Sequence, residues 1–214
     1  VAKPVASAKQ LLGSEGVRRH SSVHDHGAST PANGGTESEL LDRVAAAFGI
    51  EDWPLVAVKA FVGHSLAAAS ADQAVSALGT FHYGILPGIK TIDRVADDVH
   101  REHLSIATQD RQLDRPMDVC FVNSKGFGGN NATGVLLSPR KVERMLRKRY
   151  GEAAFAAYQA KREATRAAAR RYDEQAIRGQ FDIIYNFGHD MIDEQAIELG
   201  ADGIRVPGFP QPLR

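Results

Sequence analysis

Lys59 and His64 lie five residues apart, where the residue types change from strand-forming to helix-forming. The run from residue 55 to 62 is rich in Val and Phe and predicts a strand, and Gly63 breaks it before an alanine-rich helix from 65 to 78. His64 would then stand at a helix N-terminus, whose partial positive charge disfavours the imidazolium ion. We therefore expect a neutral imidazole that donates a hydrogen bond. A single histidine after a glycine is more often structural, so on this motif alone both interpretations stand.

Three histidines, His20, His24 and His26, come before a loop rich in Gly, Ser, Thr and Pro. On a strand, His24 and His26 would point to the same face, as two ligands of one metal ion do. No cysteine or carboxylate is spaced to complete such a site, so we expect no metal. The alternative is a polar strand end, which suits His26 least because the glycine-rich loop of residues 27–35 follows it directly.

A third motif reads Gly126-Phe-Gly-Gly-Asn-Asn131. Its glycines permit positive φ angles and bring backbone N–H groups close to a ligand, which suits an anion or oxyanion site. A glycine-rich hairpin turn has the same composition. The spacing matches neither the P-loop nor the dinucleotide-binding pattern.

The periodicity of the chain predicts the elements that would carry these motifs. A helix is expected at 37–48, with Thr36 as its N-cap and Glu39 at the capping-box position. Strands are expected at 21–26, 103–107, 118–123 and 132–137, with a short extended segment at 85–89. Strands that alternate with helices and are followed by consecutive strands indicate a layered α/β domain.

Ser138-Pro139 predicts a boundary, because Ser favours an N-cap and Pro the first helical position. Beyond it we expect an arginine-rich helix to about residue 177, interrupted at Gly151 and ended at Gly179. The sequence is therefore divided into a domain at 1–138 and an appended helical, basic segment at 139–214. Residues 140–178 hold twelve Lys and Arg against five Asp and Glu, which makes this helix either a docking face for an acidic partner or an ordinary solvated face.

Composition limits the class of protein. The chain has 214 residues, 43% of them hydrophobic, and no apolar run of the length that a membrane helix needs. No signal peptide is recognisable at the start, and the first residue is not Met, so we expect part of a longer polypeptide. A single cysteine fits a cytoplasmic location. The formal net charge of zero gives no general reason to expect nucleic acid or a membrane as partner.

The order of the three motifs resembles the C-terminal half of the β-ketoacyl-acyl-carrier-protein synthases, elongating condensing enzymes with a thiolase-like α/β fold. The resemblance covers about residues 6–138. His26-Gly-Ala-Ser-Thr-Pro is similar to the family's His-Gly-Thr-x-Thr loop, and Lys59-Ala-Phe-Val-Gly-His64 to its Lys-x-x-x-Gly-His block. Asn123-Ser-Lys-Gly-Phe-Gly-Gly-Asn-Asn131 is similar to its Asn-Ser-Phe-Gly-Phe-Gly-Gly-x-Asn turn.

The resemblance implies a role for each matching residue. His26 and His64 would hydrogen-bond the malonyl thioester oxygen and stabilise the enolate that forms as carbon dioxide leaves. Lys59, paired with Glu37, would hold the geometry and electrostatics of the two histidines. Phe127 would gate the acyl pocket, and its backbone N–H would help to form the oxyanion hole. The implied substrate-binding residues are Thr30, Ser29, Gly126 and Gly128.

Three positions depart from the family pattern. Ala28 replaces one of two threonines that bind the phosphopantetheine arm, so one hydrogen bond is lost or taken over by Ser29. Ser70 stands where Gly is usual, and Lys125 where Phe is usual. These departures indicate a divergent branch with an unusual acyl or primer preference.

In this family the acyl group is carried by a Cys at the start of a helix in the other half of the enzyme. Cys120 lies in the middle of a predicted strand, so we expect it to be a packing residue and the nucleophile to lie upstream of this chain. The predicted function is decarboxylative Claisen condensation in fatty-acid or polyketide synthesis. No cofactor is expected beyond the phosphopantetheine arm of acyl carrier protein, or CoA, as substrate carrier, and a homodimer is implied. The alternative is a non-catalytic subunit like a chain-length factor, or a carrier-protein docking module.

Overall fold

The computed structural model describes residues 1–27, 30–180 and 191–213. Within these ranges the chain forms two compact units, Val1–Phe155 and Ala156–Arg214. The first unit contains every described residue of the predicted site. The proposed division after residue 138 stays a prediction.

The first unit is built on a five-stranded mixed sheet with the order β4-β2-β1-β6-β7. Its strands are β1 (Ser21–His24), β2 (Trp53–Val56), β4 (Leu104–Ile106), β6 (Val119–Lys125) and β7 (Asn131–Leu137). The first four strands in this order are parallel, and β7 runs antiparallel to β6. A smaller antiparallel pair joins β3 (Ile85–Leu86) to β5 (Arg111–Gln112). The predicted layered α/β fold is confirmed.

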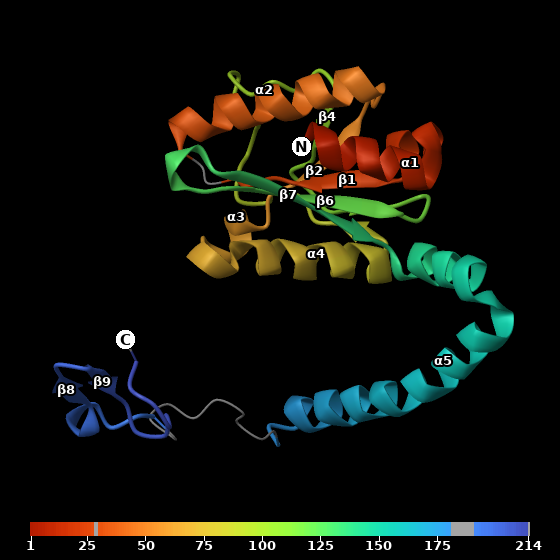
Figure 1. Ribbon diagram of the computed structural model, residues 1–214. Helices are drawn as coiled ribbons and strands as arrows, with labels where there is room; N and C mark the ends of the chain where they lie inside the picture. The colour runs from red at the N-terminus through yellow and green to blue at the C-terminus, as the bar shows by residue number, and fades with distance from the viewer. Residues whose placement is uncertain (28–29, 181–190, 214) are drawn as a thin grey trace. The chain divides into compact units, whose positions relative to one another are not determined.

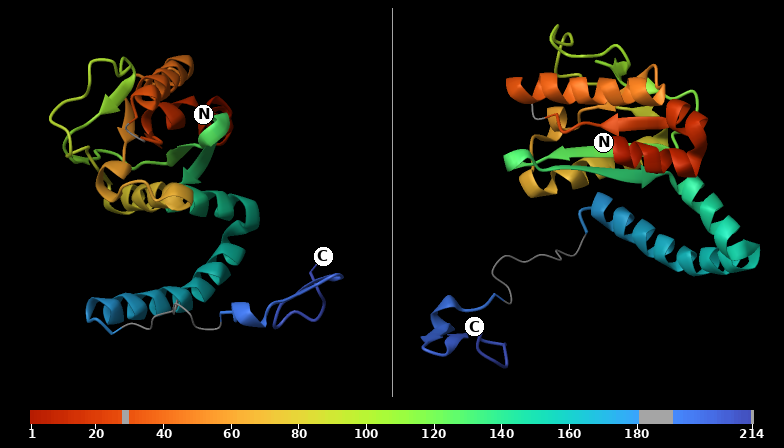
Figure 2. Two further views of the ribbon diagram at one scale, coloured as in Figure 1. Left: turned by 90° about the vertical axis from the view of Figure 1, so that its left-hand side faces the viewer. Right: turned by 45° about the horizontal axis from the view of Figure 1, so that its top comes forward.

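Helices cover both faces of this sheet. Figure 1 shows α1 (Ala2–Arg19) and α2 (Pro31–Phe48) on one face, and α3 (Lys59–Val62) and α4 (Ala69–Tyr83) on the other. The two further views in Figure 2 keep the same three layers. A 3₁₀ turn, Leu66–Ala68, leads into α4. The sheet is thus held between apolar helix faces, as its buried parallel strands require.

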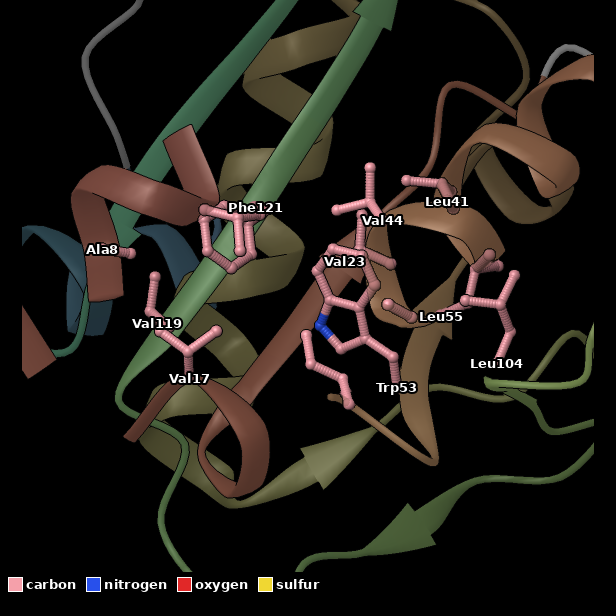
Figure 3. Packing of buried hydrophobic residues seen from close by; sticks show 13 residues of the cluster. Ala8, Val17, Val23, Leu41, Val44, Trp53, Leu55, Leu104, Val119 and Phe121 are labelled. Atoms are coloured by element: carbon pink, nitrogen blue, oxygen red, sulfur yellow. The ribbon is translucent and has the colours of Figure 1, made fainter. Parts of the chain in front are cut away.

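The main core lies between the sheet and the α1–α2 layer. Trp53 and Phe121 meet edge to face with ring centroids 5.7 Å apart, and Val23 and Leu41 are fully buried beside them (Figure 3). Val23 belongs to β1, whose alternate residues face opposite sides of the sheet. A second cluster, on the α4 side, contains Val56, Ala77, Leu86, Met117 and Cys120.

Two local predictions are wrong, and both change how the site is built. The expected strand at 55–62 ends at Val56, because β1 ends at His24 and offers no further partner. The chain then turns into the short helix α3, so Lys59 lies on a helix. Likewise, α2 begins at Pro31 with Thr30 as N-cap, so Thr36 and Glu39 form no capping box. Proline at the first helical position costs no hydrogen bond, which favours this earlier start.

Other expected elements are present. The strands predicted at 103–107, 118–123 and 132–137 correspond to β4, β6 and β7. The last helix, α5 (Pro139–Ile177), begins at the predicted proline and has non-helical angles at Gly151. Beyond it, the second unit contains a hairpin of β8 (Glu198–Gly200) and β9 (Gly203–Arg205). Among the described helices, none has the length and apolar character needed to cross a membrane.

Candidate active site

The site lies where β1, β2 and β6 end. The carboxyl ends of neighbouring parallel strands meet at one edge of a sheet, which is where α/β proteins bind their ligands. His26 follows β1, Lys59 comes three residues after β2, and Asn123 lies near the end of β6. His26, Lys59 and Asn123 are all buried at this edge.

Glu37 fixes the backbone at His26. Its Oε1 accepts the N–H of His26 at 2.8 Å and the Nδ2–H of Asn123 at 2.6 Å, and its Oε2 accepts the N–H of Gly27 at 3.2 Å. Three donors on one buried carboxylate compensate for the loss of water around its charge. Glu37 reaches this position because α2 begins at Pro31 and carries it inward in the second turn.

Lys59 holds the same residue from the other side. Its Nζ donates to the backbone carbonyl oxygen of His26. Burial lowers the pKa of Lys59, while the charges of Asp25 and Glu37 act in the opposite direction. No direct ion pair joins Lys59 to Glu37 among the described side chains. Lys59 and Glu37 are therefore linked indirectly, because Glu37 accepts the backbone N–H of His26 and Lys59 donates to the backbone carbonyl of the same residue.

The two histidines face one another at this edge. The ring centroids of His26 and His64 are 5.2 Å apart, and the ring planes are nearly perpendicular, at 78°. Nδ1 of His26 accepts the backbone N–H of Lys125 at 3.3 Å, and Nδ1 of His64 accepts that of Leu66 at 3.0 Å. Each neutral ring must then carry its proton on Nε2. Burial, and next the charge on Lys59, lower the pKa of His26, which favours its neutral form.

His64 does not stand directly at the start of α4, as the sequence predicted, because α4 begins only at Ala69. It lies two residues before the 3₁₀ turn at Leu66–Ala68 and is exposed in this chain. Leu66, which bonds its ring, has a φ of 56°, a left-handed conformation that costs a side chain with a Cβ about 1 kcal/mol. The orientation of the His64 ring is therefore set by this turn.

A second layer of polar residues supports the histidines, and the sequence reasoning assigned it no role. Nε2 of Gln73 donates to the carbonyl oxygens of Asp25 and of Asn123, the latter at 3.2 Å. Asn123 in turn accepts the hydroxyl of Thr133 at 3.0 Å. The helical periodicity could have indicated that Gln73 is buried, because it lies on the same face of α4 as the buried residues Ala69, Ala77 and Thr80.

The glycine-rich motif forms the turn between β6 and β7. The N–H of Gly126 donates to the Asn130 carbonyl at 2.7 Å, and Gly128 has a φ of 77° that favours glycine. Phe127 begins a short 3₁₀ turn, and the orientation of its side chain lies outside the description. Thr30 is exposed at the start of α2, whereas Ala28 and Ser29 lie outside the described residues.

Two of the departures from the family pattern have a structural account. The Ser70 hydroxyl lies 2.7 Å from the Ser124 hydroxyl, so its replacement of glycine adds a contact between α4 and β6. Lys125 contacts His26 through its backbone N–H, which any residue other than proline provides.

Cys120 is fully buried on β6, 2.9 Å from the Ser22 hydroxyl, and burial raises its pKa to about 12. The prediction that it packs in the core is confirmed. Of the histidines considered as metal ligands, His20 bonds the carbonyl oxygen of Pro116 at 2.8 Å, and His24 is fully buried. In the described parts of the chain, the group spaced for a metal ion is Asp42, Glu102 and His103, none of which belongs to this site.

Residues 6–93 match the family described as beta-ketoacyl synthase, C-terminal domain. Together with the mixed sheet and the paired histidines, this match shows that residues 6–93 are similar to the C-terminal domain of the beta-ketoacyl synthases, within an α/β fold of the thiolase-like class.

Comparison with individual proteins gives more detail. Over 213 residues the chain is 68% identical to the beta-ketoacyl-[acyl-carrier-protein] synthase FabY of Pseudomonas aeruginosa, covering 100% of this chain and 34% of that protein. The crystal structure of the ketosynthase FabY from P. aeruginosa superimposes with a TM-score of 0.83, over 99% of this chain and 33% of that one. The 3-oxoacyl-[acyl-carrier-protein] synthase 1 of Escherichia coli is 32% identical over 114 residues, or 53% of this chain and 26% of that enzyme. The chain thus spans about a third of the length of FabY, and its match to the E. coli enzyme covers about a quarter of that protein. The match to FabY includes α5 and the second unit.

Proposed function

We propose that this chain provides the histidine-bearing part of a β-ketoacyl-acyl-carrier-protein synthase, an acyltransferase of fatty-acid or polyketide synthesis. The observation that carries the proposal is the pair of imidazoles at 5.2 Å whose Nδ1 atoms both accept backbone N–H groups. Two Nε2–H donors from facing rings can bind one oxygen between them. A thioester carbonyl that becomes an enolate needs such a pair of neutral donors.

In this mechanism the malonyl thioester loses its carboxylate as carbon dioxide. The electron pair of the broken carbon–carbon bond moves into the enolate, whose oxygen the two Nε2–H groups stabilise. The enolate carbon then attacks an acyl thioester, and a cysteine thiolate leaves. Cys120 is unsuited to carry that acyl group because it is buried and its pKa is about 12, so the nucleophile comes from outside this chain.

The support around His26 gives it a defined task. Glu37 and Lys59 hold its backbone on both sides, and the lowered pKa keeps the ring neutral. A neutral ring donates from Nε2 without transferring a proton, so the enolate persists long enough to attack. Glu37 and Lys59 act as positioning residues.

The substrate carrier in this proposal is acyl carrier protein, which the names of the relatives contain. Thr30 and Ser29 would contact its phosphopantetheine arm, and Gly126, Phe127 and Gly128 the acyl thioester. A cytoplasmic homodimer, without a metal or a further cofactor, completes the proposal.

The test uses the full-length protein that contains this sequence and measures carbon dioxide release from malonyl carrier protein. His64→Ala should lower the rate by about 100-fold or more, because loss of one donor to a developing oxyanion has an effect of that order. His82→Ala, at an exposed histidine on α4, is the matched control and should keep the rate. Near-normal release by His64→Ala would reject the proposal.

The alternative is a non-catalytic subunit or carrier-protein docking module. The presence of His26, Lys59 and His64 together argues against it, since a scaffold needs none of their chemistry. Incubation with an acyl thioester followed by peptide mass mapping separates the two. Full-length Cys120→Ser should still take up an acyl group on another cysteine, whereas a non-catalytic subunit takes up none.

A further inference from the structure

The peptide group between Asp25 and His26 is held at both ends. Its carbonyl oxygen, which belongs to Asp25, accepts a hydrogen bond from Nε2 of Gln73. Its N–H, which belongs to His26, donates to Oε1 of Glu37 at 2.8 Å. Glu37 lies on α2 and Gln73 on α4, so the two bonds reach this peptide group from opposite faces of the sheet (Figure 1).

The next peptide group, between His26 and Gly27, is held in the same way. Lys59 donates to its carbonyl oxygen, and its N–H donates to Oε2 of Glu37 at 3.2 Å. A residue has two soft backbone angles, and both are fixed once the planar peptide groups on either side of it are fixed. The Cα–Cβ direction of His26, from which its ring extends, is therefore set by four hydrogen bonds.

Gln73 connects this peptide group to the element that follows the second histidine. It lies on α4, and the 3₁₀ turn that begins two residues after His64 leads into this helix. Gln73 comes four residues after Ala69, the first residue of α4, which is about one helical turn. Its Nε2 also donates to the carbonyl oxygen of Asn123 at 3.2 Å. One side chain thus joins the start of α4 to the ends of both β1 and β6.

A second contact docks the same part of α4. The hydroxyl groups of Ser70, in the first turn of the helix, and of Ser124 on β6 lie 2.7 Å apart. The position of His64 follows from where α4 begins, and the position of His26 follows from its two peptide groups. Gln73 bonds one of those peptide groups from α4, so it relates the two histidines to each other.

The chemistry of the Gln73 amide suits this task better than it suits packing. Both of its partners are carbonyl oxygens, which only accept hydrogen bonds, so its NH₂ group must face them. The side chain is fully buried, and its Oε1 finds no donor among the described residues. An unpaired buried oxygen disfavours folding, and an apolar side chain would avoid it on a helix face that also buries Ala69 and Ala77. A role at the site accounts for the amide.

We propose that Gln73 is the positioning residue that sets the separation of the His26 and His64 rings, whose centroids are 5.2 Å apart, for the condensation reaction. This inference rests on the proposed function, because that reaction requires both Nε2–H groups on one oxygen. Gln73 is fully buried and acts through the peptide group before His26. A displacement of about 1 Å in such a donor can lower a rate by about 100-fold.

The test measures carbon dioxide release from malonyl carrier protein by full-length Gln73→Met, a side chain of similar length without N–H donors. The kcat should fall by about 10- to 100-fold while KM stays within about threefold, because the paired donors serve an oxyanion that develops only in the transition state. Thr80→Val is the matched control. Thr80 is buried on the same face of α4, about two turns further along, and its hydroxyl bonds none of the described residues, so both constants should stay unchanged.

A double variant separates positioning from a general loss of stability. His64→Ala alone should lower the rate by about 100-fold or more. Adding Gln73→Met to it should lower the rate by less than about threefold further, since the separation of two rings matters only while both rings are present. Effects that arise independently would multiply instead.

Urea unfolding shows whether each variant is folded. If Gln73→Met does not fold, Gln73→Asn takes its place, because its shorter amide stays polar but withdraws from the two carbonyl oxygens. An unchanged kcat in the folded variant would overturn the inference, and so would effects that multiply fully in the double variant. In both cases a slow His64→Ala leaves the proposed function standing, whereas near-normal release by His64→Ala rejects that function itself.

Discussion

Glu37 Oε1 accepts the backbone N–H of His26 over 2.8 Å, although the two residues are eleven positions apart and lie on different elements. The same oxygen binds Asn123 on β6, and Lys59 on α3 bonds the carbonyl of His26. The histidine is therefore anchored by its main chain, and its ring is left to face His64. This arrangement ties the end of β1 to α2, α3 and β6.

Replacement of Glu37 by Gln should destabilise the protein and displace His26. An amide offers one oxygen where three N–H donors now meet a carboxylate, so at least one buried donor loses its partner. We expect a loss of about 2–3 kcal/mol in the free energy of unfolding. Urea unfolding and carbon dioxide release by the full-length variant would measure both effects.

The matched control is Glu39→Gln on the same helix. Glu39 is half-buried and pairs with the exposed Arg43 at 3.0 Å, a contact worth less than 1 kcal/mol. Equal effects of the two substitutions would show that the hydrogen bonds of Glu37 contribute nothing particular.

The layered fold was predictable because its strands are local apolar runs. Residues 118–123 and 132–137 read as strands and form most of β6 and β7. The error at 55–62 arose because Val and Phe favour strands, whereas a strand continues only while a neighbour pairs with it. The end of β1 at His24 decides where β2 ends, and no pattern within 55–62 contains that information.

The chemistry-bearing residues were predictable from motifs, whereas their supports were not. His26, Lys59 and His64 stand beside glycines in recognisable blocks. Gln73 bonds backbone carbonyl groups about 50 positions away in the sequence, and Asn123 bonds the carboxylate of Glu37, which is 86 positions away. Only the folded chain brings these groups together. Sequence spacing carries no signal for such contacts.

Lys59→Met should shift the acid limb of carbon dioxide release to higher pH. The charge on Lys59 is the second cause, after burial, of the lowered pKa of His26, so its removal lets that pKa rise. His26 then becomes protonated at a less acidic pH and stops serving as a neutral donor. We expect the acid limb to move to higher pH, together with a lower maximal rate because the His26 carbonyl loses its donor.

Lys90→Met is the control for this experiment, because Lys90 pairs with Asp110 at 2.8 Å on the surface. Its pH profile should coincide with that of the unchanged protein. A Lys59→Met profile whose acid limb stays in place, or moves to lower pH, would contradict the role given to this charge.

His24 should make the protein lose stability in acid. It is fully buried, neither ring nitrogen has a partner in the described chain, and burial lowers its pKa to about 4. The unfolded chain takes up a proton near the ordinary histidine value of 6.5, while the folded chain does so only near 4. As the pH falls between these values, the unfolded state binds more protons, and folding weakens by up to about 1.4 kcal/mol per pH unit.

His24→Met should remove this dependence while filling a similar volume. Its free energy of unfolding at pH 7 should not fall, because the substitution also removes two buried polar atoms without partners. Urea unfolding of the full-length protein at pH 7 and pH 5 would measure the difference, which we expect to be about 2 kcal/mol smaller in His24→Met than in the unchanged protein. His82→Met, at an exposed position on α4, should leave the difference as it is. If His24→Met and His82→Met lose stability equally between the two pH values, the buried imidazole is not the cause of the acid sensitivity.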